Sequence, residues 1–286
     1  MTFLRRAQCA ALRGFLRTVG RASDGVRIAF DEGFTSGAML DYVYRNSPSG
    51  RGLLGPLIDQ LYLSHPGWEA VRIRKAHLER LLLEAVGLEA RLGRRPVILD
   101  VASGPARYLM DVLESDARAR AVCCDRDERA LALGRAQAAA RGLGDRVRFV
   151  VGDALSGESL ALAEPQANIA VASGFYDWIT DDRVVRLSLT LLGDLLPPGG
   201  CLVFTNQSGH VDLEMVQAVF LDFHRRPLRM VTRSPDLVNR WAGAAGFEIL
   251  RTAGDEAGYY SVTLAQVPAD AFRSLSRSAT ALTACR

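Results

Sequence analysis

The chain of 286 residues is 49% hydrophobic and 23% charged, which suffices for one large domain with an appendage. The net charge is only +3, and the 35 Lys and Arg residues are interspersed with 32 Asp and Glu residues and do not form a basic block. We therefore expect no nucleic-acid partner. No run of about 18 apolar residues occurs, which excludes a transmembrane helix and stable membrane insertion.

The chain has 5 cysteines and no C-x-x-C pair, and three of the cysteines lie in or beside stretches that we expect to be buried strands. Free cysteine behaves there as a small apolar residue, so we predict reduced thiols, a cytoplasmic protein and no metal site. The five are Cys9, Cys123, Cys124, Cys201 and Cys285.

The first 21 residues contain five arginines and no acidic residue, with apolar residues at roughly helical spacing. Arg13 interrupts the apolar centre that a signal peptide would need. Two interpretations stay open: a helix lying on a membrane surface, and a helix whose apolar stripe packs on the domain while its arginines face water. The stripe consists of Leu4, Ala11, Leu12, Phe15, Leu16 and Val19.

Residues 1–93 are predicted to form a helical cap. A helix over residues 34–46 has Ser36 as its capping residue, a second is expected over 53–63, and a long third over 68–86. The third helix has an apolar stripe, and Arg74 belongs to the charged residues that we expect outside. Tyr42 and Tyr44 of the first helix are candidates to reach a functional site, or alternatively core aromatics of the cap.

The first strand is predicted over residues 97–100 and ends at Asp100. Residues 102–106 follow with almost no side-chain bulk before a helical pattern resumes at Arg107. A strand that runs through such a turn into a helix brings the backbone and a helix N-terminus close to a ligand. The P-loop lysine is absent, so phosphate is not the obvious ligand.

Strands and helices then alternate, which is typical of a parallel sheet. Asp125 and Asp153 close the second and third apolar runs, one crossover unit apart. Strands are expected at 121–124, 147–151, 168–176, 201–206, 247–250 and 259–266. Helices are expected at 109–117, 127–142 with Leu131 and Leu133 inside, 182–196, 210–225 and 235–245.

The order of these motifs resembles the class I S-adenosylmethionine (SAM) dependent methyltransferases, over roughly residues 96–265. The resemblance implies an α/β, Rossmann-like, seven-stranded sheet that is parallel with an antiparallel C-terminal hairpin, plus the N-terminal cap as a lid. The resulting domains are the cap (1–93), the SAM-binding domain (94–268) and a C-terminal tail (269–286). A closer likeness is to a bacterial branch of this superfamily whose functions are mostly unassigned.

The resemblance also implies SAM as the cofactor and assigns residues to its parts. Asp100 interacts with the ammonium group, and the turn of Ala102, Ser103 and Gly104 approaches the carboxylate. Asp125 takes the ribose hydroxyls, and Asp153 with the Ala154 N–H reads the adenine. Arg126 and Ser173 are also expected at the cofactor. Ala102 and Ala106 replace two family glycines, and alanine leaves room for backbone approach if its φ stays negative.

Catalytic candidates follow the fourth and fifth strands. Phe175 and Tyr176 could stabilise a sulfonium by cation–π attraction, or could be core aromatics. His210 could face the acceptor as a general base, or could be a hydrogen-bonded structural residue. Tyr44 of the cap completes the set, and Asp177, Asp181 and Asp182 are further candidates for a base by topology.

Three functions remain open from the sequence. The first is methyl transfer from SAM to a small-molecule substrate. The second is cyclisation of SAM to azetidine-2-carboxylate with release of methylthioadenosine, which would use an aromatic cage and no acceptor. The third is a SAM-binding or membrane-associated accessory protein without turnover. The sequence is compatible with a monomer or a homodimer.

Overall fold

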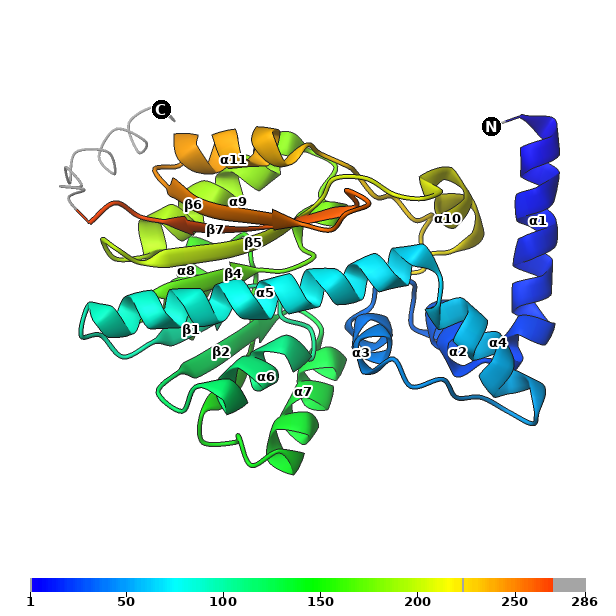
Figure 1. Cartoon of the computed structure of the whole chain (residues 1–286), viewed down its shortest axis with the longest axis horizontal. Helices are drawn as coiled ribbons and strands as arrows, with labels where there is room; N and C mark the ends of the chain where they lie inside the picture. Colours follow the sequence, from blue (N-terminus) through cyan, green and yellow to red (C-terminus); the bar gives the residue numbers. More distant parts are fainter. Residues whose placement is uncertain (1, 223, 270–286) are drawn as a thin grey trace.

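The computed structural model describes residues 2–222 and 224–269. Its strands are β1 (Val97–Asp100), β2 (Arg120–Asp125), β3 (Val147–Val151), β4 (Ile169–Ala172), β5 (Cys201–Gln207), β6 (Glu248–Gly254) and β7 (Tyr260–Gln266). They form one sheet in the order β3-β2-β1-β4-β5-β7-β6 (Figure 1). The first five strands pair in parallel, and β7 is antiparallel to both neighbours, which confirms the predicted fold class.

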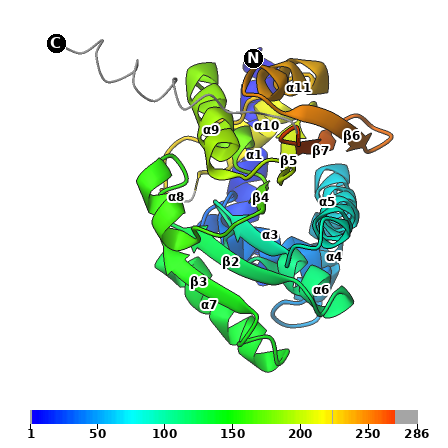
Figure 2. The ribbon, with the colours of Figure 1, turned by 90° about the vertical axis from the view of Figure 1, so that its left-hand side faces the viewer.

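Both faces of the sheet are covered by helices (Figure 2). One face packs against α5 (Pro66–Arg91), α6 (Arg107–Ser115) and α7 (Glu128–Ala140), and the other against α8 (Gly157–Ala163), α9 (Asp182–Leu195) and α11 (Pro235–Ala244). Successive strand side chains point to opposite faces, so Ile98 belongs to the first core and Leu99 to the second. Burial on both faces explains the continuous apolar runs of these strands.

The N-terminal helices form a separate apolar cluster at one end of the sheet, on the right in Figure 1. Phe34, Trp68 and Phe220 stack at its centre, with ring centroids 4.5 to 4.7 Å apart. The helices that form this cluster include α1 (Phe3–Arg17), η1 (Val19–Ala22), α2 (Asp24–Asp31), α3 (Gly37–Arg45), α4 (Leu54–Leu63) and, from the second half of the chain, α10 (Leu213–Val219).

Asp59 of α4 is a buried polar centre within this cap. Its side chain is inaccessible to solvent, and one oxygen accepts hydrogen bonds from the Ser23 hydroxyl and the Gly25 N–H. The other oxygen accepts from the Ser49 N–H and from the Tyr42 hydroxyl. One carboxylate therefore joins α4 to the start of α2, to the loop before α4 and to α3. Tyr42 belongs to this cap core.

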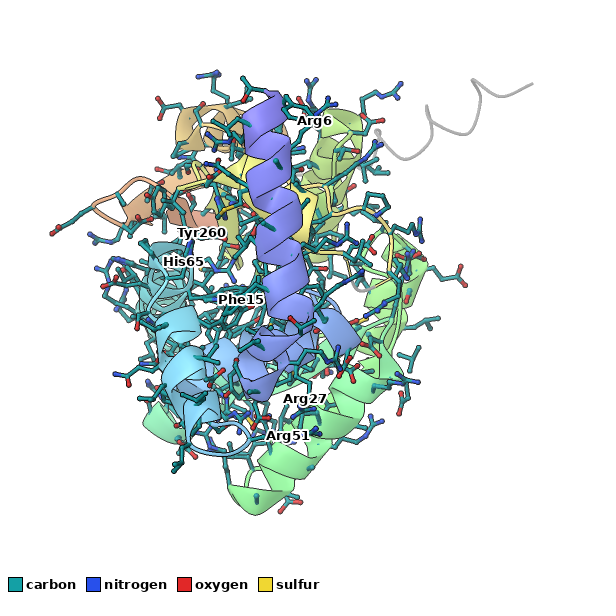
Figure 3. All side chains as sticks on the ribbon, turned by 90° about the vertical axis from the view of Figure 1, so that its right-hand side faces the viewer. Arg6, Phe15, Arg27, Arg51, His65 and Tyr260 are labelled. Atoms are coloured by element: carbon teal, nitrogen blue, oxygen red, sulfur yellow. The ribbon has the colours of Figure 1, made fainter. Side chains whose placement is uncertain are left out.

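Helix α1 runs across the end of the molecule, where Figure 3 marks Phe15 on it. Leu12 and Leu16 pack on the cap core, whereas Leu4 and Phe15 are 69% and 49% exposed. The predicted packing stripe is thus correct for Leu12 and Leu16 and wrong for the other four members, which are exposed: Leu4, Ala11, Phe15 and Val19. Arg5 makes an ion pair with Asp212 at 2.7 Å, next to α10. Within residues 2–222 and 224–269, no helix is long and apolar enough to cross a membrane.

Several sequence expectations need correction. The helix predicted over 210–225 is reduced to α10, because Asp212 caps it and the backbone leaves the helix after Val219. Leu133 is 37% exposed and faces the cavity described below rather than the core. Helices α2 and α8 were not expected. The predicted C-terminal tail lies outside the described residues from position 270 onward, and so does Cys285.

Candidate functional site

A cavity of about 1080 Å³ opens at the carboxyl ends of the parallel strands. Its walls come from the segments after β1 (101–108), β2 (125–127), β3 (152–155) and β4 (within 173–180), from the cap (within 32–44), and from Asp222 and residues within 224–229. The chain runs from β1 outward to β2 and β3 and then returns to β4 on the other side of β1, so the strand order reverses between β1 and β4. Open α/β sheets bind their ligands at such a reversal of strand order.

The turn after β1 is shaped by two left-handed residues. Gly104 has a φ of 53° and Ala106 a φ of 56°, so Ala106 does not keep a negative φ. The strained alanine directly precedes the first residue of α6. The Gly104 N–H donates to Asp125 Oδ2 at 2.7 Å, which ties this turn to the end of β2. A Cβ on Gly37 of α3 would lie 2.7 Å from Pro105, so the cap rests directly on the turn.

Asp100 lies behind this turn and is fully buried. The Tyr108 hydroxyl donates to its Oδ2, and its Oδ1 has no hydrogen-bond partner among the described residues. Burial raises the pKa of Asp100 to about 7, against the lowering effect of the Tyr108 hydroxyl and the Ala102 N–H. An unsatisfied buried carboxylate oxygen at this position is suited to a cationic group of a ligand.

The raised pKa of Asp100 makes its contribution to the stability of the ligand-free protein depend on pH. The ordinary pKa is 3.8 and the folded pKa about 7, so this contribution is most favourable below pH 3.8. It decreases as the pH rises to about 7, because the carboxyl group ionises in the unfolded chain before it does in its buried site. Asp100→Asn keeps a neutral side chain at every pH. We therefore expect the melting temperature of the wild type relative to Asp100→Asn to decrease from pH 5 to pH 8. A difference that stays constant over this range contradicts the assignment.

The other two strand-end carboxylates line the cavity. Asp125 accepts from the N–H groups of Gly104 and Asp127, at 2.7 and 2.9 Å. The Leu155 N–H and the Arg126 guanidinium hold the pKa of Asp153 below its usual range. Arg126 forms an ion pair with Asp153, and its side chain is largely exposed at the rim of the cavity.

The predicted catalytic residues fall into two groups, those that line the cavity and those that do not. Phe175 and Tyr44 line the cavity together with Ser173, Ala102, Ser103 and Ala154. Tyr176 does not: its ring is fully buried in the core beside Phe204, and its hydroxyl lies 3.3 Å from Ser188. The strand predicted over 168–176 ends at Ala172, and Tyr176 begins a short 3-10 helix (Tyr176–Trp178) whose backbone turns its ring into the core. The expectation that Tyr176 faces the sulfonium is therefore wrong.

His210 also lies away from the cavity. Its Nδ1 accepts from the Asp212 N–H at 3.0 Å, and burial lowers its pKa, as it does for the nearby His65. These contacts correspond to the structural alternative. Asp181 caps α9 and pairs with Arg183.

Sequence reasoning missed a buried pair behind the cavity. Arg74 of α5, expected outside, is 3% exposed and donates to Asp177 Oδ2 at 3.2 Å and to the Tyr44 hydroxyl at 3.1 Å. Burial raises the pKa of Asp177, and the Arg74 charge and the Gln207 N–H oppose this shift. The available signal was the position of Arg74 on the same helix face as Val71 and Leu78.

A second hollow, of about 610 Å³, lies at the opposite edge of the sheet, at the amino ends of β1, β2 and β3. Arg95, Arg120 and Arg148 on its wall are exposed, and none of the strand-end carboxylates reaches it. We therefore assign the functional site to the larger cavity. Within the described ranges, no three His, Cys, Asp or Glu side chains gather closely enough to hold a metal ion.

Comparison with solved structures gives the same fold. A possible exported protein from Bordetella parapertussis superposes with a TM-score of 0.68 at 20% identity, over 92% of this chain and 97% of that one. An O-methyltransferase family protein from Burkholderia thailandensis superposes with a TM-score of 0.54 at 16% identity, over 92% and 95% of the two chains.

Sequence comparison finds a longer relative and a family. The "Uncharacterized protein YnbC" of Escherichia coli (strain K12) is 35% identical over 257 residues, which are 89% of this chain and 44% of the relative. The chain thus spans less than half the length of this curated relative. A family model described as "Putative methyltransferase" matches residues 2–267. Because this match extends over nearly the whole chain, the protein belongs to that methyltransferase family.

Proposed function

We propose that the protein transfers the methyl group of SAM to a small molecule. The observation that carries the proposal is a row of carboxylates at the ends of three adjacent strands: Asp153 just after β3, Asp125 at the end of β2 and Asp100 at the end of β1. Asp153 and Asp125 line the cavity, and Asp100 is buried behind the turn that lines it. Adenine, ribose and the amino-acid group follow one another in the same order along SAM. Neighbouring parallel strands therefore offer one acidic group to each part of the molecule.

The contacts of these residues leave room for such a ligand. Each carboxylate oxygen of Asp125 accepts one hydrogen bond from a backbone N–H group. Each oxygen has a further lone pair, which could accept a hydrogen bond from a ribose hydroxyl. The unpartnered Oδ1 of Asp100 would attract the ammonium group from behind the turn. The N–H groups of Ser103 and Gly104 already donate to the Cys124 carbonyl and to Asp125, so the SAM carboxylate needs a donor from elsewhere in the cavity wall. Asp153 and the Ala154 N–H would hold the adenine edge.

The cavity continues past this row to a wall that would receive the acceptor. Phe175, Trp178 and Pro227 supply apolar surface there, and Arg226 and Arg229 lie at the exposed rim. Bound SAM would supply an electrophilic methyl group, and the protein would contribute mainly proximity and alignment of the acceptor. Space for a second molecule favours methyl transfer. The burial of Tyr176 removes one aromatic residue from the cage that cyclisation would use, whereas Phe175, Trp178 and Tyr44 line the cavity.

Product analysis with SAM tests this proposal. The protein is incubated with SAM alone and with pools of phenols, amines and carboxylic acids, and S-adenosylhomocysteine (SAH) and methylthioadenosine are quantified. We expect SAH only with an acceptor pool, and no methylthioadenosine above that in a sample without protein. Methylthioadenosine formed above this blank from SAM alone, together with azetidine-2-carboxylate, would establish cyclisation instead. Failure of the folded protein to bind either SAM or SAH in calorimetry would remove both activities.

A further inference from the structure

Arg74 connects three parts of the molecule behind the cavity. Its guanidinium is buried, donates to Asp177 after β4 and to Tyr44 of α3, and lies 4.7 Å from the ring centroid of Tyr260 of β7. A Cβ on Gly174, which lines the cavity, would be 3.5 Å from the same guanidinium. Figure 3 marks Tyr260 near the junction between sheet and cap. Arg74 is therefore placed to set the position of cap residues relative to the strand ends.

The chemistry of the Arg74–Tyr44 contact fixes the direction of the hydrogen bond. A guanidinium has only donors, so the Tyr44 oxygen must be the acceptor, and its own proton remains available. The hydrogen bond with Arg74 does not use that proton. Because Tyr44 lines the cavity, a bound ligand can supply an acceptor for it.

The surroundings of Tyr44 identify the part of the ligand. Helix α3 begins against the turn at Gly104 and Pro105, and Tyr44 follows two turns later on the same helix. Both Asp100 and Tyr44 are near enough to the Tyr108 hydroxyl to raise its pKa. Tyr44 thus lies at the Asp100 end of the cavity, where the proposed function puts the amino-acid group of SAM. Asp100 is suited to the ammonium group, which leaves the carboxylate for a donor beside a buried cation.

We propose that Arg74 is a positioning residue that holds Tyr44 so that the Tyr44 hydroxyl donates to the carboxylate of SAM. The inference rests on the proposed function, because it assumes a SAM-type ligand in this cavity. The Arg74–Asp177 pair anchors the guanidinium, and the second arm of the planar fork orients the phenol oxygen. The cap thereby becomes part of the cofactor site and does more than cover it.

Binding of two ligands can distinguish a specific effect of Arg74 and Tyr44 on the amino-acid group from a general loss of structure. SAH contains the amino-acid group, whereas methylthioadenosine lacks it and keeps the adenosine. We expect Tyr44→Phe to weaken SAH binding about tenfold in calorimetry, as for a lost hydrogen bond to a charged group, and to leave methylthioadenosine binding within twofold. Arg74→Lys keeps a cation for Asp177 but cannot orient Tyr44 through a second donor arm, so the same selective loss is expected.

A double variant and a control complete the test. Because Arg74 acts through Tyr44, Arg74→Lys with Tyr44→Phe should bind SAH no more weakly than Tyr44→Phe alone. Tyr176→Phe removes a buried hydroxyl outside the cavity and should leave both affinities unchanged. Unchanged SAH binding in Tyr44→Phe, equal losses for the two ligands, or additive losses in the double variant would each overturn the proposal. A wild-type protein that binds neither ligand refutes the proposed function itself, which distinguishes the two failures.

Discussion

Replacing Asp125 with alanine is expected to weaken SAH binding by about 100-fold, or about 2.7 kcal/mol. Two effects add. The variant loses the lone pairs proposed for the two ribose hydroxyls, and it frees the Gly104 N–H, whose 2.7 Å bond to Asp125 holds the turn after β1. Since the ribose belongs to both ligands, methylthioadenosine should lose affinity to a similar degree. This pattern is opposite to the selective loss expected for Tyr44→Phe.

Calorimetry with both ligands checks this expectation. Glu128→Ala is the matched control, because Glu128 is an exposed acid three residues further on, paired with Arg135 and outside the cavity wall. It should leave both affinities unchanged. An Asp125→Ala protein that keeps a normal melting temperature and binds SAH within threefold of the wild type would contradict the ribose assignment.

Replacing Asp59 with alanine is expected to destabilise the protein by at least about 3 kcal/mol. The substitution leaves the buried Gly25 N–H and the part-buried Ser49 N–H without their acceptor. The hydroxyls of Ser23 and Tyr42 lose the same acceptor, and Tyr42 keeps its contact with the Ser49 hydroxyl. An unsatisfied buried donor costs roughly 1–3 kcal/mol, so two backbone groups account for most of the loss. Urea unfolding gives the free energy directly.

A surface aspartate of the same cap provides the comparison. Asp31 pairs with Arg21 at 2.8 Å, and both side chains are about 40% exposed. An exposed ion pair contributes roughly 0–1 kcal/mol, so Asp31→Ala should change the unfolding free energy by no more than that. Equal losses for Asp31→Ala and Asp59→Ala would show that the Asp59 carboxylate does not hold the cap together.

The sheet could be predicted closely because its signals are local. Strand β1 has the predicted bounds, and Asp100 and Asp125 end their strands as expected. An apolar run and the polar residue that ends it are neighbours in the sequence, so such a strand can be recognised from a short segment. The fold class followed from the alternation of these runs with helices. In the candidate site, the same regularity brought Asp125, Asp153 and the turn after β1 to one cavity.

The errors concern properties that local pattern does not encode. The helical spacing of Arg74 with Val71 and Leu78 indicated its buried face, but its partner Asp177 is 103 residues away and could not be identified from local pattern. Phe175 and Tyr176 are equivalent in sequence, and only the backbone after β4 decides which of them turns into the core. Ala106 adopts a left-handed conformation because the entry into α6 requires it, although alanine has no preference for that region.

The two sides of the cavity differ in how the chain builds them. The carboxylate side comes from one continuous stretch, from the end of β1 to the residues after β3, while the facing side combines α3, the segment after β4 and the segment before α11. Under the proposed function, mutations in the segments after β4 and before α11 should alter acceptor choice while the strand-end carboxylates stay intact. An acceptor wall could then be exchanged by replacing these two segments alone.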